Sequence, residues 1–282
     1  MTTPLVEPRK VHLTIRPRSG WAALDLREIW LFRDLLLALA GRDLKVRYKQ
    51  TSLGVAWVIL QPLIGAGIFA FVFGAVAKLE APGGVPYFLF SFVGLLAWNA
   101  FSGTVNRSSG AMVGNEHLVS KVYFPRLILP ISTIFAALID FAVALGMLAV
   151  LLGLLWHLPG TALALMPLVL ALMLTLALGI GFAATALSVS YRDVGYVVPV
   201  ALQFLLYASP VAYPLQEVPE QYRAIYLLNP LAPLLEAFRW SLLGVGEVLW
   251  GHLLYSAACA ATALIAGAFV FKRMERKFAD VI

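Results

Sequence analysis

The chain has 282 residues, of which 61% are hydrophobic and 13% are charged, and its mean hydropathy is +0.86. Soluble domains carry about 25% charged residues, so this composition excludes an ordinary soluble protein and indicates an integral membrane protein. The net charge of +6 does not indicate nucleic-acid binding, because the basic residues lie beside apolar runs, where they face anionic lipid. The single cysteine, Cys259, excludes a disulfide framework, and the first 50 residues lack the apolar core of a cleavable signal peptide.

The N-terminal region combines a basic tail with a helical stretch. Residues 1–23 hold three prolines and four Lys and Arg residues, and this composition predicts a flexible cytoplasmic tail. Residues 24–49 follow a helical period, which predicts an amphipathic helix lying in the membrane interface. Leu36 and Leu37 fall on the apolar side of this helix, and Leu39 falls among its charged residues. A soluble helix packed on a partner domain is the alternative interpretation.

The rest of the chain, residues 50–282, is dominated by apolar runs that are long enough to cross a bilayer. The six runs are 54–77, 85–106, 127–156, 162–190, 194–213 and 248–271. The first has 24 residues and would be about 36 Å long as a helix, which exceeds the hydrocarbon core of about 30 Å. The sequence therefore predicts an all-α membrane protein with six transmembrane helices.

Basic residues set the predicted orientation. With the N-terminus in the cytoplasm, the cytoplasmic segments hold 18 of the 21 Lys and Arg residues. The opposite side holds Lys78, Arg223 and Arg239. Cytoplasmic loops are enriched in Lys and Arg, so both termini are predicted to be cytoplasmic.

Two connecting segments are unusual. The extracytoplasmic segment before the last run contains two stretches, 218–228 and 231–243, that are too short to span and too apolar for an ordinary loop. This pattern predicts two interfacial or re-entrant helices. The cytoplasmic segment 107–126 is long for a turn and has mixed polarity. It is long enough to contain a short helix that a partner protein could bind.

The sequence shows no catalytic apparatus. No stretch matches a phosphate-binding GxxxxGK loop, and the four histidines have no metal-ligand spacing. The loops contain no nucleophile elbow and no paired carboxylates. We therefore expect no catalytic residue, no metal site and no cofactor in this chain, so that a partner or an ion gradient must supply the energy.

Asp140 is the one ionisable residue in the middle of a predicted span. It has two interpretations: a proton or cation site, or a carboxylate paired with a neighbouring helix or at a subunit contact. The second is favoured. The sequence thus argues against a proton relay and favours a subunit that is driven from outside.

Three motifs carry a family resemblance. The stretch 42–62, RDLKVRYKQTSLGVAWVILQP, together with Phe-Pro-Arg at 124–126 and Asn-Pro-Leu at 229–231, resembles the membrane permease of polysaccharide-exporting ABC transporters. This group handles O-antigen, capsule and teichoic-acid chains, and the resemblance covers about residues 25–282. It implies a homodimer in the bacterial cytoplasmic membrane, two separate ATP-binding subunits that bind ATP and Mg²⁺, and a lipid-linked polysaccharide substrate.

The resemblance also implies which segments contact the ATPase. These are the N-terminal helix and the segment 107–126, for which a solvated loop is the alternative. The coupling candidates are Arg42, Lys45, Arg47, Gly114, Glu116, His117, Lys121 and Phe124. The family's two gate helices map onto 218–243. The gate candidates are Tyr222, Tyr226, Asn229 and Pro230.

A channel between two permease copies is the mechanism that the resemblance implies, with the first span facing its mate. Sugar rings present C–H faces that stack on aromatic rings, so aromatic side chains would let a polymer slide. The channel candidates are Phe69, Phe73, Trp98, Phe101, Phe204 and Tyr207. A lipid-facing belt or simple packing is the alternative role for these aromatics.

Two other functions compete with polysaccharide export. A permease for a drug or a small lipid is disfavoured, because the extracytoplasmic loops are too short for the large outer domains that many such proteins carry. An integral membrane acyl- or glycosyltransferase would need a constellation of carboxylates, histidines or cysteines near the interface, and none is evident.

Overall fold

The computed structural model describes residues 26–49, 56–155, 160–275 and 278, and these residues form helices and turns without a β-strand. The predicted tail, residues 1–23, lies outside this part. The helices are α1 (Leu26–Leu31), α2 (Arg33–Lys49), α3 (Ala56–Phe69) with the π-helix η1 (Ala70–Val76), η2 (Pro82–Gly84), α4 (Tyr87–Gly110), η3 (Val113–Asn115), α5 (Glu116–Lys121), α6 (Ile128–Leu154), η4 (Thr161–Leu165), α7 (Met166–Ser190), α8 (Val194–Tyr207), η5 (Leu215–Glu217), α9 (Glu220–Tyr226), α10 (Leu231–Leu243) and α11 (Trp250–Glu275).

Five of the described helical segments are long and apolar enough to cross a membrane: α3 with η1, α4, α6, η4 with α7, and α11. The predicted fold class, an all-α integral membrane protein, is confirmed. The remaining predicted run, 194–213, is helical only as far as Tyr207, so α8 has 14 residues. The turn that follows leads into Pro210, and a proline disfavours helical backbone in the residue before it. The six-span arrangement stays a prediction.

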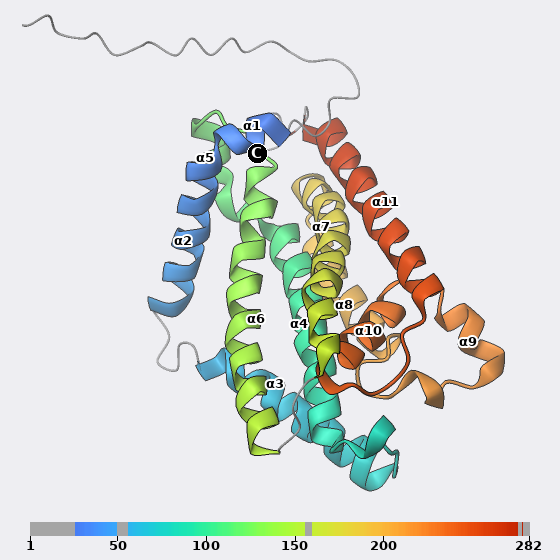
Figure 1. The fold of residues 1–282 in the computed structure, drawn as a ribbon. Coiled ribbons are helices and arrows are strands. Elements are labelled where there is room, and N and C mark those ends of the chain that lie inside the picture. Colours follow the sequence, from blue (N-terminus) through green and yellow to red (C-terminus); the bar gives the residue numbers. More distant parts are fainter. Residues whose placement is uncertain (1–25, 50–55, 156–159, 276–277, 279–282) are drawn as a thin grey trace, which may run out of the picture.

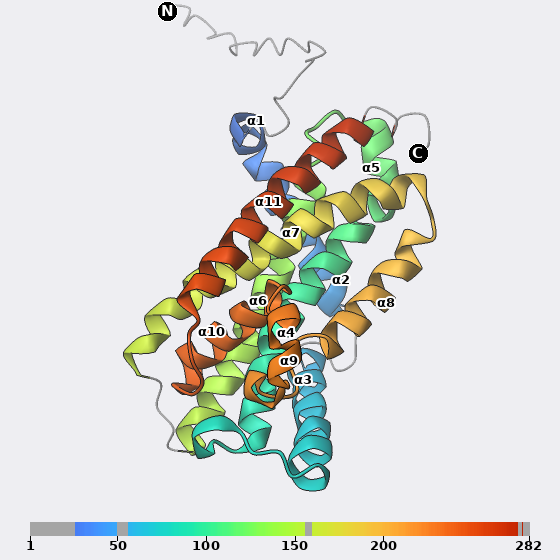
Figure 2. The ribbon, with the colours of Figure 1, turned by 90° about the vertical axis from the view of Figure 1, so that its right-hand side faces the viewer.

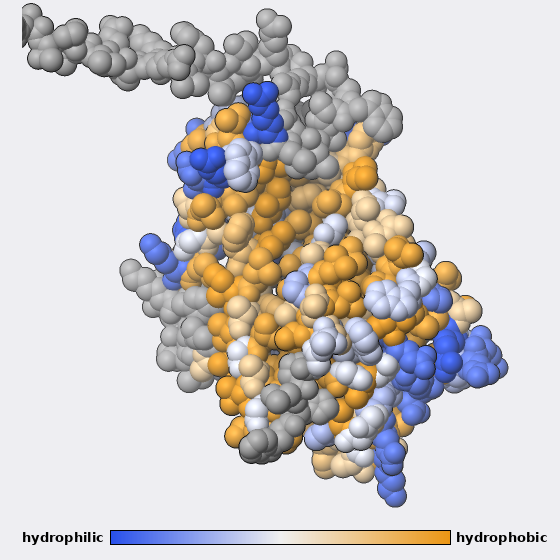
Figure 3. Space-filling model, viewed as in Figure 1, coloured by the Kyte–Doolittle hydropathy of each residue, from blue (hydrophilic) through white to orange (hydrophobic). Residues whose placement is uncertain are grey.

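The surface is divided in the way a bilayer requires. Hydrophobic residues cover the middle of the molecule, and hydrophilic residues gather around α1 and α2 and again around α9 (Figure 3). Helices α1 and α5 and the end of α11 lie together at one end of the bundle (Figure 1). We call this the α1–α5 end.

Helix α4 is the centre of the bundle and packs against α3, α6, α7 and α10 (Figure 1). Of its most apolar stretch, 78% is buried, compared with 11% for α3 with η1. Helix α3 therefore leaves most of its apolar surface uncovered by the rest of the subunit.

Helices α7 and α11 run side by side along the bundle (Figure 2). Their contact depends on glycine, because a Cβ atom added at Gly267 would lie 1.9 Å from the backbone oxygen of Gly179. Lipid provides no hydrophobic drive for association between helices, so close backbone packing at small residues is a main source of stability here.

The N-terminal helical stretch is broken at Phe32 into α1 and α2. Helix α2 packs beside α6 (Figure 1) and buries Leu36, Leu39 and Ala40. The predicted face is therefore wrong in part, because Leu39 is buried and Leu37 is exposed. Contact with α6 selects the buried side of α2. The position of this stretch in the membrane interface stays a prediction.

Candidate functional site

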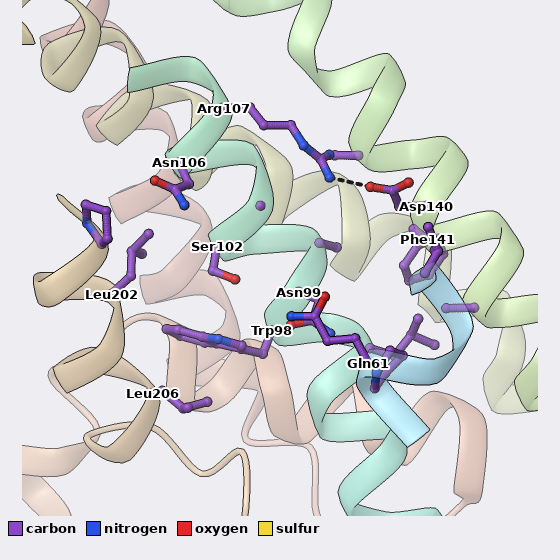
Figure 4. A pocket seen from close by; sticks show the side chains of 18 of the residues that line it. Gln61, Trp98, Asn99, Ser102, Asn106, Arg107, Asp140, Phe141, Leu202 and Leu206 are labelled. Carbon is purple, nitrogen blue, oxygen red and sulfur yellow. Dashed lines mark hydrogen bonds and ion pairs between the residues drawn. The ribbon is translucent and has the colours of Figure 1, made fainter. Parts of the chain in front are cut away.

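A polar cavity of about 390 Å³ lies among α3, α4, α6 and α8 (Figure 4). Asn99, Ser102 and Asn106 line it from one face of α4, because positions i, i+3 and i+7 point to the same side of a helix. Gln61 of α3 and Gln203 of α8 complete the polar lining. Within the described part of the chain, none of these five side chains has a hydrogen-bond partner. The cavity thus offers donors and acceptors to something outside the subunit.

An ion pair lies in the same cavity. The guanidinium of Arg107, on α4, donates through Nη2 to the Asp140 carboxylate on α6 (Figure 4). This confirms the interpretation of Asp140 as a carboxylate paired with a neighbouring helix. Pairing is what makes two charges tolerable at membrane depth.

The cavity adjoins a surface that the subunit leaves uncovered. Its exposed residues recur at helical spacing and are Trp57, Ile64 and Ile68 on α3, Phe71 on η1, and Tyr196, Val200, Phe204 and Tyr207 on α8. We call this surface the α3–α8 face. It combines aromatic and aliphatic side chains with the polar cavity between the two helices.

Five of the six predicted channel aromatics are accessible to different degrees. Phe204 and Tyr207 are exposed on the α3–α8 face. Phe69 and Phe73 are half-buried and meet edge to face, with ring centroids 5.8 Å apart. Trp98 lines the cavity and is otherwise buried. These five remain channel candidates.

Phe101 is different, because its side chain is fully buried. It packs on the Trp98 ring at a centroid distance of 5.8 Å. Since it cannot line a channel in this conformation, Phe101 is assigned to packing instead.

The two predicted coupling segments touch each other at the α1–α5 end. Arg42 Nη2, on α2, donates to Asn115 Oδ1 at the end of η3 over 2.5 Å, and also to Asp43 Oδ1 over 2.8 Å. Asn115 Nδ2 in turn donates to the backbone oxygen of Ala111 over 2.8 Å. The side chains of Arg42 and Asn115 therefore link α2 to η3.

Five of the other coupling candidates lie on α2, η3 and α5. Lys45, Gly114, Glu116, His117 and Lys121 are exposed and open to a partner. The side chain of Arg47 lies outside the described part of the structure.

Phe124 is buried among apolar side chains that include Phe271 and Phe278, so it cannot touch a partner directly. Its neighbour Arg126 donates to the backbone oxygen of Glu275 over 3.0 Å, and its guanidinium lies 5.9 Å from the centroid of the Phe278 ring. We therefore reassign Phe124 from partner contact to anchoring. The Phe-Pro-Arg motif fastens the coupling segment to the end of α11.

The Asn-Pro-Leu motif joins the gate segment to the end of α8. Asn229 Nδ2 donates to Ser209 Oγ over 2.8 Å and to the Ala208 backbone oxygen over 3.1 Å. Its Oδ1 accepts from the backbone N–H of Leu231 over 3.0 Å, and Pro230 precedes the first residue of α10. One side chain thus starts α10 and holds the turn after α8.

The two tyrosine candidates of the gate segment differ in exposure. Tyr222 is exposed, whereas Tyr226 is half-buried and shares a hydrogen bond of 2.9 Å with the Tyr213 hydroxyl. Burial, followed by this hydrogen bond, raises the pKa of Tyr226. Tyr226 is therefore a neutral hydroxyl and not a charged group.

A fully buried ion pair was missed by the sequence reasoning, which placed Arg239 in a short extracytoplasmic helix and gave it no partner. Arg239 Nη1 donates to Glu236 Oε1 over 2.9 Å, with both side chains almost fully buried. Its Nη2 donates to the backbone oxygens of Pro210 and Val211, the latter over 2.6 Å. The spacing of opposite charges at i and i+3 within an apolar stretch was the available signal.

This arginine lies at the junction of three elements. Its guanidinium is 4.0 Å from the centroid of the Phe90 ring on α4, within cation–π range. A Cβ atom at position 94 of α4 would come within 2.6 Å of Arg239 Nη2, so Gly94 is needed for the close approach. Arg239 thereby joins α10, the turn after α8, and α4.

Comparison with known proteins adds the family. A family model described as ABC-2 type transporter matches residues 34–243, which include the cavity, the coupling segment and α10. The chain belongs to the ABC-2 type transporter family. This confirms the resemblance that the sequence motifs indicated.

Three relatives of this ABC-2 chain extend the match beyond the family model. It is 30% identical to the O-antigen export system permease protein RfbA of Myxococcus xanthus, over 91% of this chain and 98% of the relative. It is 26% identical to the RfbA protein of Klebsiella pneumoniae, over 88% and 95% of the two chains. It is 29% identical to the polysialic acid transport protein KpsM of Escherichia coli, over 72% and 78%.

Proposed function

We propose that this chain is the permease subunit of an ATP-driven exporter that moves a lipid-linked polysaccharide across the bacterial cytoplasmic membrane. The RfbA and KpsM relatives, which carry the names of polysaccharide transport proteins, support this substrate class. The chain acts as a transport subunit and not as an enzyme. ATP and Mg²⁺ bind to two separate ATP-binding subunits.

The observation that carries the proposal is the uncovered α3–α8 face with its polar cavity. Lipid tails cannot hydrogen-bond the five polar side chains, so this face needs an aqueous or a protein neighbour. A second copy related by a two-fold axis would present the same face and enclose the two cavities between the subunits. The enclosed space is the channel.

The coupling mechanism uses the contacts at the α1–α5 end, which the charge asymmetry assigns to the cytoplasm. An ATP-binding subunit pushes on the exposed side chains of α5, and the Arg42–Asn115 hydrogen bond passes the displacement to α2. Helix α2 precedes α3 in the chain, and α3 lines the channel. At the other end, Asn229 and Arg239 tie α10 to the end of α8, the second channel helix.

Surface polysaccharide, measured in a strain that lacks this permease, tests the proposal. The F204A/Y207A variant of the α3–α8 face is expected to lower export severalfold. The matched control is F269A, an exposed aromatic on α11 that lies outside this face, and it is expected to export normally. If F204A/Y207A is present in the membrane at the wild-type amount and exports normally, the α3–α8 face does not line the channel.

Partner binding is measured separately by co-purification from a strain that expresses the accompanying ATP-binding subunit. The proposal requires a complex that holds two copies of each chain. Recovery of the permease as a monomer, without an ATPase, from a membrane that exports polysaccharide would contradict it.

A further inference from the structure

The uncharged polar groups that line the cavity are carboxamides and a hydroxyl, set among apolar side chains. Gln61, Asn99, Asn106 and Gln203 each offer both donors and acceptors, and Ser102 adds a hydroxyl. This is the set of groups that matches sugar hydroxyls, which also donate and accept. Because these side chains have no hydrogen-bond partner within the described chain, binding a hydroxyl would not require breaking an internal bond.

The polar groups of α4 form a ladder. At a rise of about 1.5 Å per residue, Asn99, Ser102 and Asn106 are separated along the helix axis by about 4.5 and 6 Å. Figure 4 shows these three side chains stacked along α4. A sugar hydroxyl that leaves one of these side chains can form a similar hydrogen bond with the next one, about one helical turn away. This arrangement holds a sugar chain without trapping it.

Charge is almost absent from the same surfaces. Among the described residues that line the cavity, the charged groups are Arg107 and Asp140, which neutralise each other. Residues 56–76 and 194–207, which include α3 and α8, contain no Asp, Glu, Lys, Arg or His. Among the described lining residues, the carboxylates of an acidic polymer would therefore meet no cation beyond the one already paired with Asp140. Such unpaired charges are costly in a low-dielectric environment.

On the basis of the proposed function, we infer that the cavity is a binding subsite for an uncharged, hydroxyl-rich segment of the exported sugar chain, and that it discriminates against acidic chains. The carboxamides and Ser102 bind the hydroxyls. The Arg107–Asp140 pair keeps the cavity neutral.

The test uses the complete permease–ATPase complex in lipid nanodiscs and two fluorescent probes of equal length, a mannose oligomer and an oligosialic acid. Wild-type complex is expected to bind the mannose oligomer at least tenfold more tightly than the acidic probe. N99L/N106L is expected to weaken binding of the mannose oligomer by about tenfold, because two hydrogen-bonding rungs are lost. T262A removes a hydroxyl from an exposed position on α11 and is expected to leave binding unchanged.

Charge variants locate the discrimination in the cavity. D140N removes the carboxylate that neutralises Arg107 and is expected to improve binding of the oligosialic acid by about tenfold or more, with a smaller change for the mannose oligomer. R107Q/D140N restores a cavity without net charge and is expected to restore the wild-type preference. The double variant therefore separates an effect of charge from a loss of structure.

Three results would overturn the subsite: equal or tighter binding of the acidic probe by wild type, an unchanged preference in D140N, or no binding of either probe. Export of surface polysaccharide is measured in the same strains. If the strains export polysaccharide normally but the complex binds neither probe, the subsite alone is refuted. If the wild-type permease neither restores polysaccharide export nor forms a complex with the ATPase, the proposed function is refuted.

Discussion

Replacing Arg239 with methionine is expected to destabilise the subunit by about 3–5 kcal/mol, the usual cost of removing one partner from a buried ion pair. The Glu236 carboxylate would stay buried without its cation, since only 5% of that side chain is exposed. The backbone oxygens of Pro210 and Val211 would lose their donor as well. Buried acceptors without a donor cost about 1–3 kcal/mol each, so the upper part of the range is expected.

Thermal unfolding of the purified permease in detergent measures the effect. A change of 1 kcal/mol moves the midpoint of a domain of this size by about 2–4 °C, so R239M is expected to unfold about 6–20 °C below wild type. The control is R223M on α9, because within the described part of the chain the Arg223 guanidinium makes two long contacts, of 3.3 and 3.5 Å, with backbone oxygens. R223M is expected to change the midpoint by about 2 °C or less.

The double variant E236Q/R239M tests the reasoning itself. It buries no charge, and glutamine keeps the size and shape of the glutamate side chain at position 236. We expect it to recover at least about 2 kcal/mol relative to R239M, because the isolated carboxylate is the main cost. A double variant that is no more stable than R239M, or an R239M midpoint within about 2 °C of wild type, would refute the argument.

Three further predictions follow from close contacts and exposed charges. G267A places a methyl group 1.9 Å from a backbone oxygen of α7 and is expected to abolish a monodisperse peak in size-exclusion chromatography, whereas G146A, whose Cβ meets nothing within 4 Å, is expected to elute normally. Charge reversal in E116K/K121E is expected to reduce both recovery of the ATPase complex and its ATP hydrolysis severalfold, and unchanged values would favour a solvated loop. R42A removes the hydrogen bond from α2 to η3 and is expected to lower export more than recovery of the complex; normal export would show that this bond does not transmit the displacement.

Several features of the fold could be predicted from the sequence because they are local properties of the chain. A run of about 20 apolar residues forms a helix in a bilayer whatever its neighbours are, since its backbone hydrogen bonds must close within the segment. The gate segment was divided correctly at Asn229 and Pro230, because proline starts a helix well and cannot continue one. The short helix α5 lies within the segment 107–126, where the sequence left room for one.

Other features were missed or misplaced because they depend on which helix lies next to which. Leu37 and Leu39 exchanged their predicted exposures when α2 packed on α6. Phe101 and Phe204 are both aromatic residues within apolar runs, yet one is buried at the centre of the bundle and the other is exposed. Helical periodicity shows which residues share a face, but it does not say what that face meets.

The sequence by itself determined the membrane class, the helical content, the family and the side of the membrane that we propose for each end. Each follows from composition, run length and short motifs. These are local properties of the sequence and do not depend on how the helices pack. Only the tertiary structure decided the pairing of Arg107 with Asp140, 33 residues away, and the contact of Arg239 with the turn after α8. Buried charges pair with groups that are close in space and not in sequence. The polar cavity and the junction of α10 with α8 therefore form only when the helices pack together.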